Sequence, residues 1–327
     1  MAKKSPDADA ITSRLDREGI AALYHFTSIE NLPRIARAQA LSSKAVLEKT
    51  GNWPPPEPGG NEISFIQDRQ NDNWDKVPFN FRTCTPMAWG VRRAKHLCFF
   101  VVGSQVATWE GVVFTDTNAA KALGNQKRAM GAAGLDLISF DVFRSDPRPA
   151  DRDGWHRPIQ AEVLVPGQVP LAEVREVAFV SEASLNEGIR LWGQSERPPF
   201  QTDPKFFADY PSRPVLVFNF PFLQKVVLTD EMVDRENAEV AREHKEIVRR
   251  RDATLVTAVL SLKALAGTEG TVRWDPPGIV ASQNFAQSGS YTWWPHVQMR
   301  DLPDGRCSIE IWLSEIRWAK IEFKVTG

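Results

Sequence analysis

The sequence predicts an α+β protein. A strand-rich mixed domain is expected at residues 1–193, a connector at 194–229, and a C-terminal extension of one helix and a small β-sheet at 230–327. Short apolar runs, of the length typical of buried strands, recur along the first part of the chain between a few helical patterns. A polar stretch with five prolines, 194–214, then separates these runs from a long segment with helical periodicity.

The first predicted strand, 20–26, leads into Thr27 and Ser28. Either residue can cap a short helix, because its side-chain oxygen accepts a free N–H of the first turn. Residues 51–60, GNWPPPEPGG, are predicted to form an exposed loop, since consecutive prolines remove backbone donors. Further strands are expected at 77–81, 97–102, 111–115, 159–165 and 174–180, and helices at 86–95, 119–124 and 182–192.

The C-terminal extension is predicted to begin with a helix and to continue as strands. The helix is expected at about 230–265, because a highly charged first part leads into LVTAVLSLKAL, which is amphipathic at helical spacing. Strands are expected at 270–274, 291–299 and 307–325, with turns at two segments that contain both proline and glycine, 276–278 and 303–305.

Composition argues against several classes of protein. Forty Lys and Arg oppose 41 Asp and Glu in 327 residues, so a polyanion would have to be bound by a local basic patch. Apolar runs are far shorter than the roughly 20 residues that span a bilayer, and no secretory signal is recognisable. The three cysteines lack C-x-x-C spacing, which argues against disulfides and a cysteine zinc site. We therefore expect a cytoplasmic protein with no metal and no membrane contact.

Glu162 is the most informative single residue, because it interrupts the apolar strand IQAEVLV at 159–165. Burying an unpaired carboxylate costs several kcal/mol, so a functional partner or a cavity would explain it. Strand alternation offers another interpretation, in which Gln160, Glu162 and Leu164 share a face that is exposed to water.

Three other segments favour the functional interpretation. His25 and Thr27 lie on one face of the extended segment 24–27, although a lone histidine at a strand end is more often a packed one. The segments VPFNF followed by TPMAW, at 77–89, contribute aromatic rings that could hold a flat ligand. The third segment, FTDTNAA at 114–120, contains capping residues.

Taken in order, these motifs resemble those of the DarT family. The matching motifs are Tyr24-His25-Phe26-Thr27, then Asn31-Leu32-Pro33 with Ile35, then VPFNF with TPMAW, FTDTNAA and IQAEVLV. They run from about residue 22 to about residue 182. DarT proteins are bacterial toxins that use NAD to ADP-ribosylate bases in single-stranded DNA, and they are usually paired with a macrodomain antitoxin, DarG.

The resemblance implies a fold and roles for individual residues. The implied fold is that of ADP-ribosyltransferases, with two small, packed, mostly antiparallel sheets around an NAD cleft. Glu162 matches the catalytic glutamate, which would stabilise an oxocarbenium-like ribose without a metal. Arg69 is the candidate for the catalytic arginine, with Arg82 as the second choice. The residues expected to bind NAD are His25, Phe26, Thr27, Asn31 and Trp89.

The loop 144–158, directly before the glutamate strand, is the expected contact with nucleic acid. Single strands are typically held by basic side chains and by aromatic rings on which bases stack. The expected contacts are Arg144, Arg148, Arg152, Trp155, His156 and Arg157. An alternative is a solvated surface loop, in which Asp146, Asp151 and Asp153 offset the positive charge.

The leading hypothesis from sequence is therefore an NAD-dependent ADP-ribosyltransferase that modifies a base in single-stranded DNA, as a toxin or in phage defence. Two alternatives stay open. The first is an ADP-ribosyltransferase that acts on RNA, because stacking and phosphate contacts do not distinguish the two sugars. The second is an inactive module of the same fold that binds nucleic acid or a protein partner.

Overall fold

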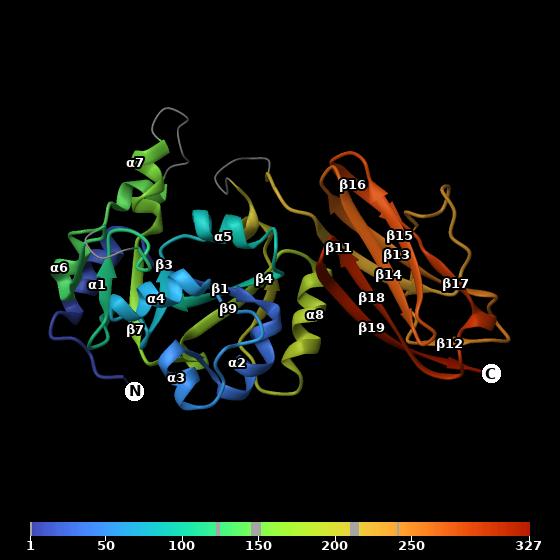
Figure 1. Ribbon diagram of the computed structural model, residues 1–327, viewed down its shortest axis with the longest axis horizontal. Coiled ribbons are helices and arrows are strands. Elements are labelled where there is room, and N and C mark those ends of the chain that lie inside the picture. Colours follow the sequence, from blue (N-terminus) through green and yellow to red (C-terminus); the bar gives the residue numbers. More distant parts are fainter. Residues whose placement is uncertain (1, 122–124, 145–151, 210–215, 241) are drawn as a thin grey trace.

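The computed structural model describes residues 2–121, 125–144, 152–209, 216–240 and 242–327. It contains a mixed α/β part, formed by the first two thirds of the chain, and an all-β part formed by the C-terminal third (Figure 1). In the described residues no helix is both long and apolar enough to cross a bilayer.

The mixed part is built on one eight-stranded sheet. Its strands lie in the order β10-β9-β4-β1-β3-β7-β5-β6. Neighbouring strands are antiparallel, apart from the parallel pair β9 and β10. The strands are β1 (Ala22–Ser28), β3 (Lys76–Asn80), β4 (Leu97–Gly103), β5 (Val113–Thr115), β6 (Arg128–Met130), β7 (Glu162–Pro166), β9 (Val174–Phe179) and β10 (Phe200–Thr202).

This sheet differs from the two separate small sheets that were expected. β1 pairs with β4 along its whole length, but it pairs with β3 through a single register position, Tyr24 opposite Asn80. Beyond that position His25 bridges the two strands, because its Nδ1 lies 2.9 Å from the carbonyl oxygen of Pro78. One pair of residues is thus enough to join the two halves into a continuous sheet while leaving space between β1 and β3.

Eight helices in the described residues surround the sheet, and a two-stranded sheet of β2 (Ala40–Ser42) and β8 (Gln168–Pro170) lies beside it. The helix expected at 182–192 is confirmed, whereas the one expected at 86–95 ends at Val91. Residues 119–121 form a turn and no helix, and 122–124 lie outside the described residues. The helices are α1 (Ala8–Arg17), α2 (Leu32–Ala38), α3 (Lys44–Lys49), α4 (Glu62–Gln70), α5 (Pro86–Val91), α6 (Gly131–Leu135), α7 (Arg152–His156) and α8 (Glu182–Trp192).

The prediction of a helix at 230–265 is wrong. That segment contains β12 (Ile247–Arg249) and β13 (Leu255–Ala264). Most residues of β13 are buried on both faces of the strand, so its sequence is almost continuously apolar. Periodicity cannot distinguish such a strand from a buried helix, and the β-branched Val256, Thr257 and Val259 were the better signal.

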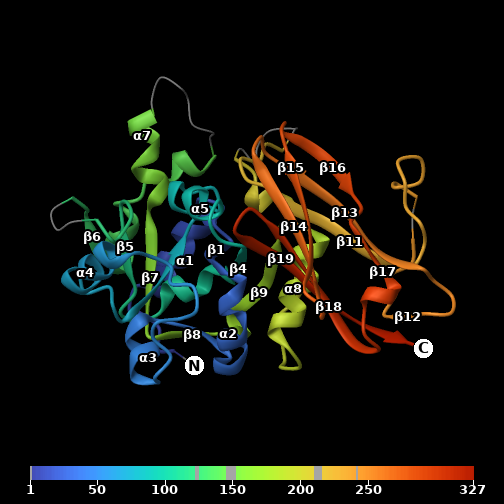
Figure 2. The ribbon, with the colours of Figure 1, turned by 45° about the vertical axis from the view of Figure 1, so that its right-hand side comes forward.

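Two sheets of the C-terminal third pack face to face (Figure 2). Trp274 and Trp318 are fully buried in their shared core. The expected strand at 291–299 is divided in two, and 307–325 folds as a hairpin. One sheet contains β11 (Phe222–Thr229), β13, β16 (Gly289–Trp293) and β17 (His296–Gln298). The other contains β12, β14 (Thr268–Asp275), β15 (Ile279–Phe285), β18 (Gly305–Leu313) and β19 (Ile316–Thr326).

The segment expected as a connector, 194–229, contributes to both parts of the protein. β10 extends the eight-stranded sheet, and β11 belongs to the β-sandwich. α8 lies between the two parts (Figures 1 and 2), where Ser181 at its N-terminus donates a hydrogen bond to the carbonyl oxygen of Leu223 at 2.5 Å. One apolar core continues from α8 into the sandwich.

Candidate active site

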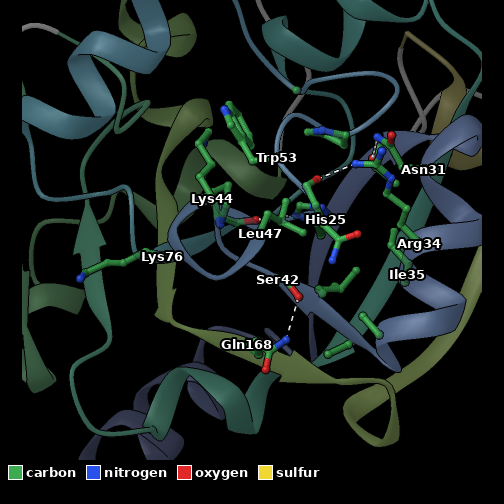
Figure 3. Close-up of a pocket in the computed structure, with 18 of the residues that line it drawn as sticks. His25, Asn31, Arg34, Ile35, Ser42, Lys44, Leu47, Trp53, Lys76 and Gln168 are labelled. Atoms are coloured by element: carbon green, nitrogen blue, oxygen red, sulfur yellow. Dashed lines mark hydrogen bonds between the residues drawn. The ribbon is translucent and has the colours of Figure 1, made fainter. Parts of the chain in front are cut away.

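Two cavities adjoin the eight-stranded sheet, and both are lined by Glu162. Cavity A has a volume of about 480 Å³ and is shown in Figure 3. Cavity B has a volume of about 500 Å³. Cavity A is lined by His25, Phe26, Thr27, Asn31, Arg34 and Trp53, among others. Cavity B is lined by Asn61, Ser64, Asp68, Asn118, Ala119 and Gln160, among others. Besides Glu162, the residues common to both are Lys44, Gly59, Lys76, Pro78 and Met87.

Glu162 begins β7, a strand in the middle of the sheet. It lies opposite Asn80 of β3 on one side and Thr115 of β5 on the other. Its side-chain Oε2 accepts a hydrogen bond of 2.8 Å from the backbone N–H of Ala119, and the Asn80 side chain forms a second hydrogen bond with it. Only 4% of Glu162 is exposed, so the interpretation in which it faces bulk water is wrong.

The turn after β5 delivers the N–H that contacts Glu162. The Thr115 hydroxyl donates a hydrogen bond of 2.6 Å to the carbonyl oxygen of Thr117. This bond folds the chain back, so that the backbone N–H of Ala119 faces the carboxylate on β7, the strand that pairs with β5. The FTDTNAA motif therefore supports the glutamate directly and does not start a helix.

Burial raises the pKa of Glu162 from 4.5 to about 7. The hydrogen bond from Ala119 opposes this rise, since it stabilises the carboxylate. The negative charge of Asp68 adds to it, whereas Asn80 and Lys44 oppose it. Near neutral pH the group is therefore divided between its charged and uncharged forms, which is typical of a catalytic acid or base.

His25 is held in a defined state by its neighbours. A carbonyl oxygen can only accept, so the 2.9 Å contact with Pro78 places a proton on Nδ1 of the ring. Burial lowers the pKa of His25, which keeps the ring neutral at pH 7. Nε2 is then left as an acceptor on a side chain that lines cavity A.

Asn31 ties one wall of cavity A to β1. Its amide nitrogen donates to the hydroxyl of Thr27 at 2.9 Å and to the carbonyl oxygen of Glu57 at 2.8 Å. Its amide oxygen accepts from the backbone N–H of Glu57 at 3.1 Å. Since the amide is engaged on both sides, Asn31 holds the loop 51–60 over the cavity.

The same loop has further anchors. Arg34 donates to the carbonyl oxygens of Asn52 and Pro54, at 2.5 and 2.8 Å. Lys95 donates to the carbonyl oxygen of Pro58 and forms an ion pair with Glu57, both at 2.8 Å. The loop is therefore well supported although it contains no regular element.

Arg69 and Arg82, the two candidates for a catalytic arginine, do not line cavity A or cavity B. The guanidinium of Arg69 contacts the carboxylate of Glu48 at 2.7 Å and lies 3.5 Å from the ring centre of Trp74. Arg82 lines a third cavity, of about 410 Å³, together with Tyr24.

Of the two aromatic residues expected at NAD, Phe26 lines cavity A and Trp89 does not. The Trp89 ring stacks on Trp155, with ring centres 5.9 Å apart and planes inclined by 16°. Met87, on the same short helix, lines both cavities instead. This helix therefore contributes Met87 to the cavity walls, whereas the ring of Trp89 packs elsewhere.

The residues expected to contact nucleic acid have different surroundings. Arg144 forms ion pairs with Glu18 and Asp141, while Arg157 pairs with Asp116 at 2.9 Å. Trp155 is buried against Trp89, and the His156 ring contacts both indoles. Arg152 begins α7, and Arg148 lies outside the described residues.

Several residues of the site were not found from the sequence, and an ion pair is among them. Lys44 and Asp68 form an ion pair of 2.9 Å, and both line cavity B with Glu162. Neither belongs to a recognisable motif, and they lie on different helices, so no local signal could have paired them. In the part of the chain that the structure describes, no group of three or more His, Cys, Asp or Glu side chains is arranged to hold a metal.

Comparison with known proteins gives a family match and several similar structures. A family profile described as "ssDNA thymidine ADP-ribosyltransferase, DarT" matches residues 24–208. No curated protein sequence matches. Thermus sp. 2.9 DarT in complex with ADP-ribosylated ssDNA is 21% identical, with a TM-score of 0.46, over 63% of this chain and 99% of that one.

The same Thermus protein in complex with NAD+ is 21% identical, with a TM-score of 0.43, over 57% of this chain and 97% of that one. Thermosipho africanus DarTG in complex with ADP-ribose is 19% identical, with a TM-score of 0.46, over 57% of this chain and 51% of that one. The profile match ends before the β-sandwich begins at β11.

Proposed function

The chain belongs to the DarT family of ssDNA thymidine ADP-ribosyltransferases, and from this premise we propose that Glu162 is its catalytic carboxylate, cavity A its NAD site and cavity B its site for the thymine base. The observation that carries the proposal is that Glu162 lines both cavities. A group that must act on the donor ribose and on the acceptor base has to reach both, and Glu162 is placed to do so.

The chemistry of cavity A suits a dinucleotide. Its volume of about 480 Å³ lies within the range of cavities that bind small molecules. Arg34, Arg37 and Lys44 line it, and we propose that their positive charges attract the pyrophosphate. We propose that His25 and Thr27 orient the nicotinamide ribose, with Phe26 beside them, and that Asn31 contributes by holding the cavity wall.

Transfer breaks the bond between the ribose C1′ and the nicotinamide nitrogen, and the electron pair leaves with nicotinamide. A new bond forms between C1′ and the ring nitrogen of the thymine base that gives up its proton. The carboxylate of Glu162 stabilises the positive charge that develops on the ribose, because it is fixed in place and shielded from water. With a pKa of about 7 it also accepts a proton from the attacking base. Arg69 would have to leave Glu48 before it could contribute to this step.

Cavity B suits an uncharged base. Amide and hydroxyl groups of Asn61, Ser64, Asn118 and Gln160 line it, and such groups both donate and accept hydrogen bonds. We propose that the DNA strand reaches this cavity past residues 154–158, with Arg157 on its path, because Gln160, which lines the cavity, donates a hydrogen bond to the carbonyl oxygen of His156. Residues 145–151 of the expected contact segment lie outside the described residues. We further propose that the enzyme is a toxin that acts in phage defence, and that a macrodomain-type antitoxin restrains it.

The function can be tested by mass spectrometry of oligonucleotides incubated with the protein and NAD. The substrates are a single-stranded DNA with one thymine, the same DNA with cytosine in its place, and the RNA of matched sequence. We expect an ADP-ribose adduct on the thymine DNA only, and with Glu162→Gln an adduct reduced on the order of 100-fold or more. Adducts on RNA alone, or none with folded wild-type protein, would refute the proposal.

A further inference from the structure

Lys44 occupies an anchored position at the start of α3, where cavities A and B meet. The backbone is fixed on both sides of it. The N–H of Ser43 donates to the carbonyl oxygen of Gly167 at 2.8 Å, and the N–H of Ala45 donates to that of Trp74 at 2.9 Å. Figure 3 shows the Lys44 side chain extending into cavity A, while Lys76 points away from it.

The first turn of a helix favours acidic side chains, so the local helix gives no reason for a lysine at this position. Its partner lies elsewhere in the chain. The Lys44 ammonium is 2.9 Å from the carboxylate of Asp68 on α4, and only 8% of Asp68 is exposed. The ion pair is therefore partly buried, with Lys44 lining both cavities and Asp68 lining cavity B, and the buried carboxyl group of Glu162 lines the same two cavities as Lys44.

We propose that Lys44 and Asp68 form a charge pair that sets the ionisation of Glu162, in which Lys44 is a positioning residue that keeps the carboxylate anionic and Asp68 limits that effect. The proposal rests on the proposed function, because the anion is the form that stabilises the ribose in transfer. Lys44 and Asp68 come from α3 and α4, and Glu162 comes from β7, so the three charges meet only in the folded protein.

Apart from Arg37, the other charged groups that line the cavities around Glu162 have their own hydrogen-bond or ion-pair partners or are neutral. Lys76 of β3 lies 2.8 Å from Asp75, and Lys95 lies 2.8 Å from Glu57. Burial lowers the pKa of His25, so this ring is uncharged at neutral pH. Arg34 donates to two carbonyl oxygens of the loop 51–60. Arg37 also lines cavity A, and cavity B has no further charged group among the described residues.

The two charges act on Glu162 in opposite directions. Asp68, which has the larger effect of the two, raises the pKa of the carboxyl group, whereas Lys44 lowers it. An adjacent charge typically shifts a pKa by about one unit or more. From a pKa of about 7, a rise of about one unit reduces the ionised fraction at pH 7 from about one half to about one tenth. Loss of Lys44 should therefore reduce kcat at pH 7 about fivefold.

The test is the pH dependence of kcat at saturating NAD and thymine DNA. Activity should rise with pH as Glu162 loses its proton. In Lys44→Met this rise should move about one pH unit upward, and in Asp68→Asn it should move downward. Lys44→Arg should restore the wild-type profile, because it restores the charge. Lys49→Met, at the exposed end of the same helix, is the matched control and should not shift the profile.

The proposal is overturned if the pH dependence of kcat does not shift in Lys44→Met, or if it shifts in the same direction in Lys44→Met and Asp68→Asn. A rise in the KM for NAD does not change this conclusion. The pKa of the Glu162 carboxyl group can also be measured directly by carbon-13 NMR, with its signal assigned by its absence in Glu162→Gln. This measurement distinguishes the same outcomes and needs no catalytic turnover. It therefore tests the charge pair even if the wild type transfers no ADP-ribose, an outcome that would refute only the proposed function. If Lys44→Met does not fold, Asp68→Asn still has to lower the pKa of Glu162.

Discussion

Arg317 on β19 of the β-sandwich forms an ion pair of 3.2 Å with Glu30, the residue immediately before Asn31. The same guanidinium lies 3.7 Å from the buried carboxylate of Glu187 on α8. Since Asn31 holds the loop over cavity A, this contact connects the sandwich to the wall of the proposed NAD site. The C-terminal third, which lies outside the family match, is thus attached close to the catalytic part.

Replacement of Arg317 by Met should destabilise the protein by about 2 kcal/mol and raise the KM for NAD. Breaking a buried ion pair typically costs about 3–5 kcal/mol, but Arg190 still pairs with Glu187 in this variant. Urea unfolding measures the first effect and initial rates the second. Arg300→Met, at an exposed side chain, is the control. Unchanged stability would mean that the contact does not join the two parts.

Replacement of Glu162 by Gln should reduce ADP-ribose transfer on the order of 100-fold or more, because the group that stabilises the developing charge is lost. The shape of the side chain is retained, so the cavities and the contact with Ala119 should persist. Quantitative mass spectrometry of the modified oligonucleotide measures the rate. Glu269→Gln, at an exposed position of β14, should behave as wild type. Retention of more than a tenth of the activity would exclude a catalytic role for Glu162.

Glu162 should also make the stability depend on pH. Its pKa rises from 4.5 in the unfolded chain to about 7 in the folded protein, so the folded state binds the proton more tightly. The stability that this group contributes is complete below about pH 4.5 and is lost as the pH rises to about 7, a change on the order of 3 kcal/mol. Glu162→Gln removes this dependence.

The measurement is the difference in unfolding free energy between Glu162→Gln and wild type. The free energy of unfolding of the variant should increase relative to that of the wild type from pH 5 to pH 8, because only the wild type must keep a buried charge at the higher pH. A difference that stays constant across this range would show that Glu162 titrates normally.

Replacement of Asn31 by Ala should raise the KM for NAD by about tenfold, with a smaller effect on kcat. The variant loses the hydrogen bonds to Thr27 and Glu57, which contribute roughly 1 kcal/mol each. The loop 51–60 should then become more accessible, and limited proteolysis within it should accelerate. An unchanged KM together with faster proteolysis would show that the loop does not bind the donor.

Local patterns predicted much of the catalytic part. The strands around His25 and Glu162 and the helix at 182–192 follow from short apolar runs and from capping residues, which act over a few neighbouring positions. The family resemblance, confirmed by the profile match, also depended on such motifs. The β-sandwich was less predictable, because the double-sided burial of β13 removed the alternation that identifies a strand.

The sequence by itself determined the family, the strand that carries Glu162, and the presence of His25 and Thr27 on one face of another strand. Only the tertiary structure decided that Glu162 is buried between two cavities, that Trp89 packs against Trp155, and that Lys44 and Asp68 line cavity B together with the carboxylate. The reason is physical. Strand formation depends on neighbours in the chain, whereas burial and charge interactions depend on distances in space that only the folded chain defines.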